Sequence, residues 1–142
     1  MGKFLDLRTS ENSNTTGFPN TALTSATVIG VIGLQTGNVA NPIVGLNSYV
    51  VVSAAAGSTV TANVLRGGVT IYTAIRAFAS SNAAADIALA AADLAAPAAA
   101  QTVYQLVLSG TPAPGEGTGV TRIGPESFWG IAQNGAVPAT PA

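Results

Sequence analysis

The chain has 142 residues and a mass of 14.0 kDa, enough for one domain with a hydrophobic core and too few for a second. Charged residues make up 8% of it, against about 25% in an average soluble protein, and the net charge is -1. Nucleic acid and anionic membranes need clustered Lys and Arg, so this charge balance excludes them as partners. The chain has no Cys and no His, which excludes disulfides, thiolate metal sites and the commonest catalytic base.

The N-terminal 20 residues divide into an apolar cluster and a polar stretch. Phe4, Leu5 and Leu7 have no apolar partners nearby in the sequence, and residues 9–20 are rich in Ser, Thr, Asn and Gly. We therefore expect residues 1–20 to be an extended connector and linker, with Phe4, Leu5 and Leu7 docking on a neighbouring subunit by strand addition. The region lacks the apolar stretch of a secretory signal, so we expect synthesis in the cytoplasm without a signal peptide. Apolar runs elsewhere stop short of the roughly 20 residues of a membrane span, so no membrane insertion is expected.

Residues 21–135 show a sequence pattern typical of a β-sandwich. Short β-branched runs alternate with Gly, Pro and Asn, as in residues 59–65 and 102–108. This pattern predicts an all-β, antiparallel jelly-roll sandwich of about eight strands. Arg66, Gly67 and Gly68 predict a hairpin between two runs. Residues 136–142 are expected to form a flexible tail.

The segment 83–100 gives conflicting signals. It is dominated by alanine, the best helix former. Pro97 blocks continuation, however, and small residues alternate with Ile87 and Leu89 as in a strand. We favour strand for residues 83–94 and keep helix as the alternative.

No group of residues in the sequence forms a recognisable catalytic site. Asp86 and Asp93 are seven positions apart, so a strand would point them to opposite faces, and we expect both to be solvent-facing charges. Arg66, Arg76 and Arg122 are expected to be isolated and not to form an anion site. We predict no catalytic, cofactor-binding or metal-binding residues, no cofactor and no enzymatic activity. Phe128 and Trp129 are expected to be core or interface anchors.

Several short motifs, read in order, resemble a known family. They are Asn-Pro-x-Val-x-Leu at residues 41–46, the hydrophobic-Arg-x-Gly hairpin at residues 64–72, residues 102–107, and the closing run 123–130. This succession is similar to the exosporium protein C family and to subunits of endospore appendage fibres. The resemblance implies a structural jelly roll, with Arg66, Gly67, Gly68, Gly124 and Pro125 as fold and turn determinants.

Composition and resemblance together predict a subunit that self-assembles into a fibre or surface layer of the bacterial endospore, located in the exosporium or an appendage. A chain without Cys or His and with a single Met offers little for oxidation or pH to alter. The expected partners are further copies of the chain and a spore-coat or exosporium anchor protein. The alternatives are a viral capsid, tail or decoration protein and a lectin-like adhesion module.

Overall fold

The computed structural model describes residues 3–115 and 119–135 of the chain. These residues form nine strands and no helix, so the predicted all-β class is confirmed. The predicted tail, residues 136–142, lies outside the described part. The strands are β1 (Lys3–Ser13), β2 (Thr21–Ala22), β3 (Thr27–Gln35), β4 (Pro42–Ala54), β5 (Thr59–Arg66), β6 (Val69–Ala77), β7 (Asn82–Asp93), β8 (Gln101–Thr111) and β9 (Val120–Asn134).

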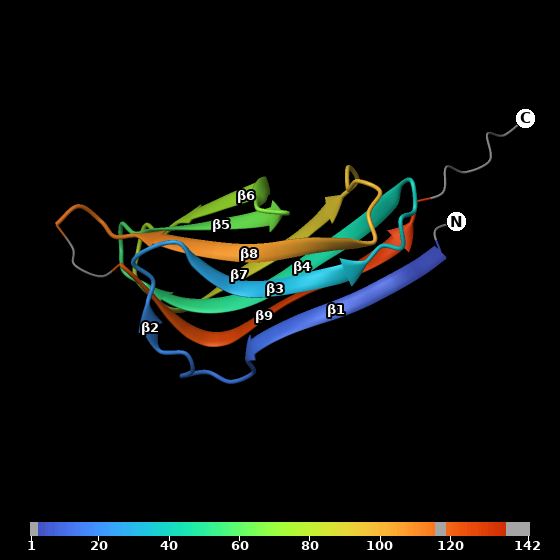
Figure 1. Ribbon diagram of the computed structural model, residues 1–142. Helices are drawn as coiled ribbons and strands as arrows, with labels where there is room; N and C mark the ends of the chain where they lie inside the picture. The colour runs from blue at the N-terminus through green and yellow to red at the C-terminus, as the bar shows by residue number, and fades with distance from the viewer. Residues whose placement is uncertain (1–2, 116–118, 136–142) are drawn as a thin grey trace, which may run out of the picture.

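The strands build two antiparallel sheets, which lie on one another as a sandwich (Figure 1). Sheet A has the order β1-β9-β4-β7, with the short β2 also paired to β9, and sheet B has the order β3-β8-β5-β6. When the eight long strands are numbered along the chain, the two sheets read 1-8-3-6 and 2-7-4-5. This is the jelly-roll arrangement, so the prediction of about eight strands in a jelly-roll sandwich is confirmed.

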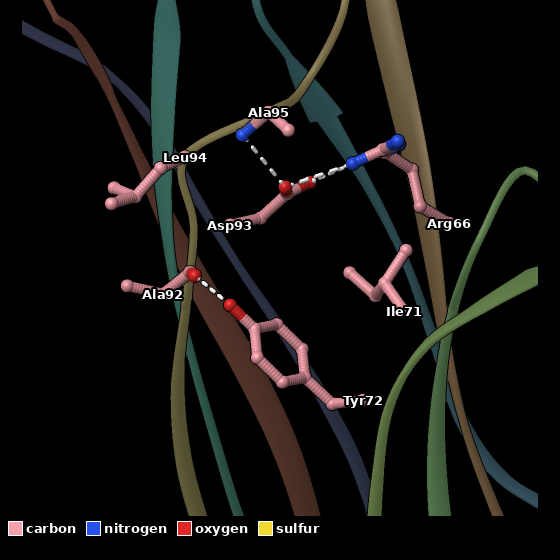
Figure 2. Close-up of a pocket in the computed structure, with 7 residues that line it drawn as sticks. All are labelled: Arg66, Ile71, Tyr72, Ala92, Asp93, Leu94 and Ala95. Carbon is pink, nitrogen blue, oxygen red and sulfur yellow. Dashed lines mark hydrogen bonds and ion pairs between the residues drawn. The ribbon is translucent and has the colours of Figure 1, made fainter.

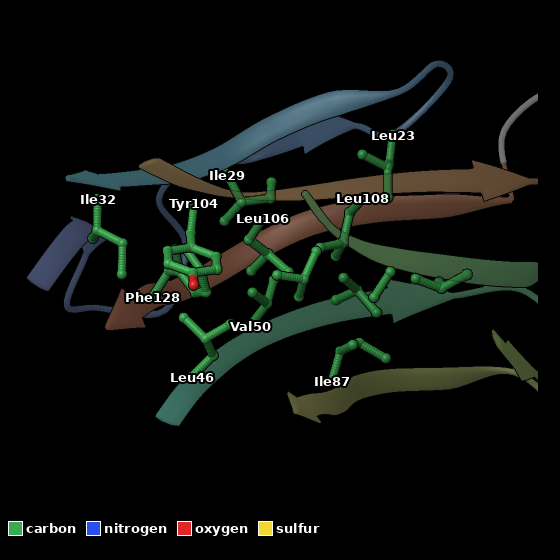
Figure 3. Close-up of a cluster of buried hydrophobic side chains, with 14 of the residues drawn as sticks. Leu23, Ile29, Ile32, Leu46, Val50, Ile87, Tyr104, Leu106, Leu108 and Phe128 are labelled. Carbon is green, nitrogen blue, oxygen red and sulfur yellow. The ribbon is translucent and has the colours of Figure 1, made fainter. Parts of the chain in front are cut away.

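The core lies between the sheets and is built mainly by alternate residues of β3, β4, β5, β7, β8 and β9. Strand β4 shows the pattern: Val44, Leu46, Ser48 and Val50 are buried, and Gly45, Asn47 and Tyr49 between them are more exposed. Figure 3 shows large side chains from both sheets meeting in one layer, among them Tyr104, Leu106 and Phe128. This alternation of inward and outward residues is the pattern from which the sequence predicted a β-sandwich.

The alanine-rich segment is a strand from Asn82 to Asp93, as predicted over its helix propensity, and the strand ends before Pro97. β7 pairs with β4 along almost its whole length, and Ala85 and Ile87 point into the core. A helix would satisfy its own backbone groups but bury few apolar atoms with alanine alone, whereas a strand also pairs the backbone edge of β4 and places Ala85 and Ile87 in the core.

The N-terminal residues depart from the expected connector and linker. Residues 3–13 form β1, which pairs antiparallel with β9 of the same chain, from Lys3 beside Asn134 to Ser13 beside Glu126. β1 is therefore the first of the eight jelly-roll strands, and the boundaries predicted for a separate arm (1–20) and a sandwich beginning at residue 21 are wrong. The prediction of a separate arm failed because β1 has few apolar residues and pairs with a strand more than 110 residues away in the sequence.

Of the glycines that the resemblance pointed to, Gly67 and Gly68 form a turn, whereas Gly124 lies inside strand β9 at an irregularity of its pairing with β4, so Gly124 and Pro125 do not form the predicted turn. Gly67 and Gly68 join β5 to β6 with φ angles of 57° and 86°, the pair of positive values that a tight two-residue hairpin requires. Gly124 has a φ of 70° and precedes a cis peptide to Pro125. The backbone carbonyls of Thr15 and Phe18 approach it so closely that a Cβ would clash with them.

Candidate interaction surfaces

The outer face of sheet A carries a set of exposed large apolar side chains. Strand pairing places Leu7 of β1 beside Ile131 of β9, and Trp129 lies two positions along β9 on the same face. Tyr49 of β4 pairs with Ser127, one further step along. We call the exposed residues Phe4, Leu7, Tyr49, Trp129 and Ile131 the outer band.

The strands beside the outer band carry small residues on the same face. Ile131 lies opposite Gly45 of β4, which in turn pairs with Ala92 of β7. Trp129 lies opposite Asn47, which pairs with Ala90. The face is therefore raised over β1, β9 and Tyr49 and is lower at Gly45 and over the alanines of β7.

On one open side of the sandwich, β1 of sheet A contacts the edge strand β3 of sheet B. The Asp6 carboxylate accepts a hydrogen bond from the Gln35 backbone N–H at 2.8 Å, and the Ser10 hydroxyl accepts one from the Val31 N–H at 3.4 Å. The first of these, reinforced by Arg8, holds the pKa of Asp6 below its usual value. Side chains of one sheet thus occupy backbone donors of the other.

On the opposite open side, side chains of sheet B bond to backbone acceptors of sheet A. Two side chains of β6 in sheet B donate to backbone carbonyls of β7 in sheet A: the Tyr72 hydroxyl to Ala92 and the Arg76 guanidinium to Asp86. Figure 2 shows the Tyr72 ring reaching across to the β7 backbone. The Tyr72 contact borders a hollow of about 380 Å³ that Ile71 and Leu94 also line.

A buried charged cluster joins the two sheets beside that hollow. The Arg66 Nη1 lies 2.8 Å from both oxygens of Asp93, and the Tyr104 hydroxyl donates to Asp93 Oδ2 at 2.7 Å (Figure 2 shows the Arg66 pair). Burial pushes the pKa of Asp93 up, but the bonds from Tyr104 and Arg66 outweigh it and hold that pKa below its usual value. Burial and the adjacent Asp93 carboxylate raise the pKa of Tyr104.

This cluster corrects the prediction for the two aspartates. Asp86 is exposed, as expected, and Asp93 is on the opposite face of β7, as their spacing implied. Asp93 is nevertheless almost completely buried and paired, so the prediction of a solvent-facing charge is wrong for it. A buried carboxylate is tolerated here because a cation and two further donors satisfy it.

A second buried carboxylate ties β1 to β9. Glu126 is 0% exposed and accepts from Arg122 Nη2 at 2.6 Å and from Arg122 Nε at 2.8 Å. The side-chain amide of Asn12 donates to the same carboxylate at 2.6 Å. Arg66 and Arg122 each hold a separate acid, and Arg76 lies over the Phe78 ring, so the three arginines form no common anion site.

The predicted anchors and connector residues fall on both faces of sheet A. Phe128 is buried in the core, and Trp129 belongs to the outer band. Leu5 packs against the core at a bulge in β1, whereas Phe4 and Leu7 are exposed. Sequence reasoning missed Tyr49 and Ile131, although each stands at an outward position of an alternating strand.

Residues 3–115 and 119–135 contain no group of three or more acidic residues placed to hold a metal ion. The same part of the chain has no helix that is long and apolar enough to cross a membrane.

Comparisons with known proteins support the fold alone. No family model matches the chain, and neither does any curated protein. Among solved structures, dimeric latent PorU from Porphyromonas gingivalis is similar with a TM-score of 0.52 and 12% identity, covering 92% of this chain and 13% of that one. Infectious bursal disease virus is similar at a TM-score of 0.53 in its Gx strain, with 8% identity over 94% of this chain and 33% of the viral one. Its Gt strain has the same TM-score, with 14% identity over 94% and 34%.

This chain thus spans between about an eighth and a third of the proteins that it resembles in structure. Identities this low leave the shared feature as the β-sandwich itself.

Proposed function

We propose that the protein is a structural subunit that self-assembles into a fibre or surface layer. The observation that carries this proposal is the outer band: five large apolar side chains exposed on one face of sheet A, contributed by three adjacent strands. Contiguous apolar surface of this kind marks an interaction site. Trp and Tyr are also the residues that most often dominate the binding energy of interfaces.

The partner that best fits this face is another copy of the chain. The outer band carries no charge, and the small residues beside it, such as Gly45 and Ala90, leave room for the large ones of a second sheet. Two sheets stack about 10 Å apart when their side chains interdigitate, and large side chains on one sheet fit beside small ones on the other. With net charge -1, two copies repel each other weakly.

Strand addition by Phe4, Leu5 and Leu7 takes the form of an exchange of β1 between copies. β1 is an edge strand that forms its ladder with β9 alone among the described strands, and residues 14–20 connect it to β2. An identical copy offers the same β9 edge, the same Glu126 for Asn12 and the same Gln35 for Asp6. Exchange therefore keeps each native contact and changes only the chain that provides it.

Placement on the endospore, in the exosporium or an appendage, rests on the sequence resemblance, as does a spore-coat or exosporium anchor protein as a further partner. A non-enzymatic role is part of the same proposal.

Negative-stain electron microscopy of the purified chain tests the proposal, with Ile131→Lys as the disrupting variant. Val103→Lys is the matched control, because Val103 and Ile131 are both 38% exposed but lie on the outer faces of different sheets. We expect fibres or layers from the native chain and from Val103→Lys, and none from Ile131→Lys. Closed shells would favour the virion alternative, and a native chain that stays monomeric at high concentration would overturn the proposal.

A further inference from the structure

The edge of β7 that faces away from β4 carries backbone groups without a strand partner among the described residues. Three of its even-numbered residues are engaged by side chains: the Ala84 N–H by Asn82, the Asp86 carbonyl by Arg76 and the Ala92 carbonyl by Tyr72. In a strand, the N–H and C=O of alternate residues point to the same edge. Ala88 and Ala90 must therefore direct their backbone groups to this edge as well.

The stretch of β7 between the Tyr72 and Arg76 contacts is short, its outward side chains are exposed, and it has no charged residue. Both Ala88 and Ala90 are exposed, and β6 contacts β7 without forming a ladder with it. A hollow of about 260 Å³, lined by Ala74, Ile75 and Ala88 among others, lies beside this stretch. An exposed edge with small uncharged side chains is the kind that pairs readily with another strand unless something covers it.

We propose that the β7 edge is a latent pairing site for a second copy of this chain and that Tyr72 and Arg76 act as gatekeepers that keep it closed. Each gatekeeper occupies one edge carbonyl at either end of the Ala88–Ala90 stretch. An incoming strand must displace both side chains before it can extend its ladder beyond these two residues. The positive charge and length of Arg76 also make it the type of residue that protects natural sheet edges.

The partner strand that fits is β7 of the second copy, running antiparallel. In the register that places Ala88 opposite Ala90, Asp86 lies opposite Ala92 and no two charges face each other. All side chains from Ala88 to Ala92 are alanine or leucine, so neither copy imposes a steric barrier. Such pairing would join two copies of sheet A into one continuous sheet.

This inference goes beyond the proposed function, because it concerns an edge that assembly through the outer band and β1 leaves closed. A guarded β7 edge restricts growth to the intended joints and prevents lateral pairing of the sheets.

The test removes both gatekeeping hydrogen bonds while keeping side-chain bulk, in the variant Tyr72→Phe/Arg76→Met. Its control is Thr73→Val, which removes the hydrogen bond from Thr73 to Asn63 on the other face of the same strand. All variants carry Ile131→Lys, so that association through the outer band does not mask the result. Sedimentation velocity then measures the concentration at which dimers form.

We expect the gatekeeper variant to dimerise at a concentration at least ten times lower than Thr73→Val. Adding Ala90→Pro should abolish this dimer, because the Ala90 N–H points away from β4 and its loss breaks no ladder bond between β7 and β4. Unchanged association of a folded variant, or a dimer that survives Ala90→Pro, would overturn the inference. If the double variant fails to fold, Tyr72→Phe alone is judged by the same criteria.

Discussion

Asp6 and Gln35 stand on edge strands of different sheets, and the carboxylate of one accepts the backbone N–H of the other at 2.8 Å. A side chain of β1 thereby satisfies a donor that β3 would otherwise present to solvent. Ser10 makes the same kind of contact with Val31. β1 therefore closes one side of the sandwich as well as extending sheet A.

Replacing Asp6 by Ala should loosen this closure. We expect the Gln35 amide to exchange with deuterium faster, and the free energy of unfolding to fall by about 1–2 kcal/mol, because a backbone donor loses a charged acceptor. Glu11→Ala, on the exposed outer face of the same strand, is the control and should leave both quantities unchanged. Equal effects of the two variants would show that the Asp6 contact does not hold β1.

Arg66→Ala should be among the most damaging single substitutions. It leaves the Asp93 carboxylate buried without its cation, a loss worth about 3–5 kcal/mol in denaturant unfolding. Arg8→Ala provides the comparison, because Arg8 also pairs with an aspartate but is more than half exposed, and it should cost less than about 1 kcal/mol. Similar losses for both would mean that burial of the Arg66 pair has no energetic consequence.

Stability should be flat near neutral pH and fall at both extremes. The lowered pKa of Asp93 means that its stabilising effect is full above the ordinary aspartate value of 3.8 and is lost as pH falls through the folded value. The raised pKa of Tyr104 means that stability declines as pH rises above 10, where the unfolded chain loses that proton first.

Urea unfolding from pH 2 to 11 measures this profile. Asp93→Asn should be less stable at pH 7 and should lose less stability than the native chain between pH 5 and 2. A variant profile parallel to the native one would assign the acid transition to other groups.

Gly130 and Gly45 allow a test of how closely the sheets pack. A Cβ at Gly130 would lie 2.8 Å from Ile32 Cδ1 and 3.1 Å from Leu46 Cδ2, inside the core. At Gly45 the nearest atom is Ile131 Cγ2 at 3.4 Å, an ordinary contact on the outer face. We expect Gly130→Ala to lower the melting temperature, at a cost of about 1–2 kcal/mol. Gly45→Ala should be neutral or slightly stabilising.

The β-sandwich could be predicted from the sequence because the alternation of buried and exposed residues is a local pattern. The burial pattern of β8, from Thr102 to Leu108, and the turn at Gly67-Gly68 can both be predicted from a few adjacent residues. The alanine-rich β7 was also predictable, since Ile87 and Leu89 mark one face of it.

The role of β1 and the buried charges were not predictable in this way. Asn12 meets Glu126 across 114 positions, and Asp93 meets Arg66 across 27. A charged residue in an alternating strand gives no local sign of whether its partner lies on the facing sheet or in solvent. The outer band is likewise assembled from three strands, so only the strand order brings Leu7, Trp129 and Tyr49 onto one surface.

Assembly with exchange of β1 can be tested most directly by a disulfide across the β1–β9 pair. Glu11 and Ser127 are directly opposite on the outer face, and the chain has no other cysteine. The variant Glu11→Cys/Ser127→Cys is allowed to assemble under reducing conditions, then oxidised and run on a non-reducing denaturing gel. The proposed exchange predicts a ladder of covalently linked multimers. A single band of one-chain mass from assembled protein would show that β1 stays with its own chain and would contradict this account.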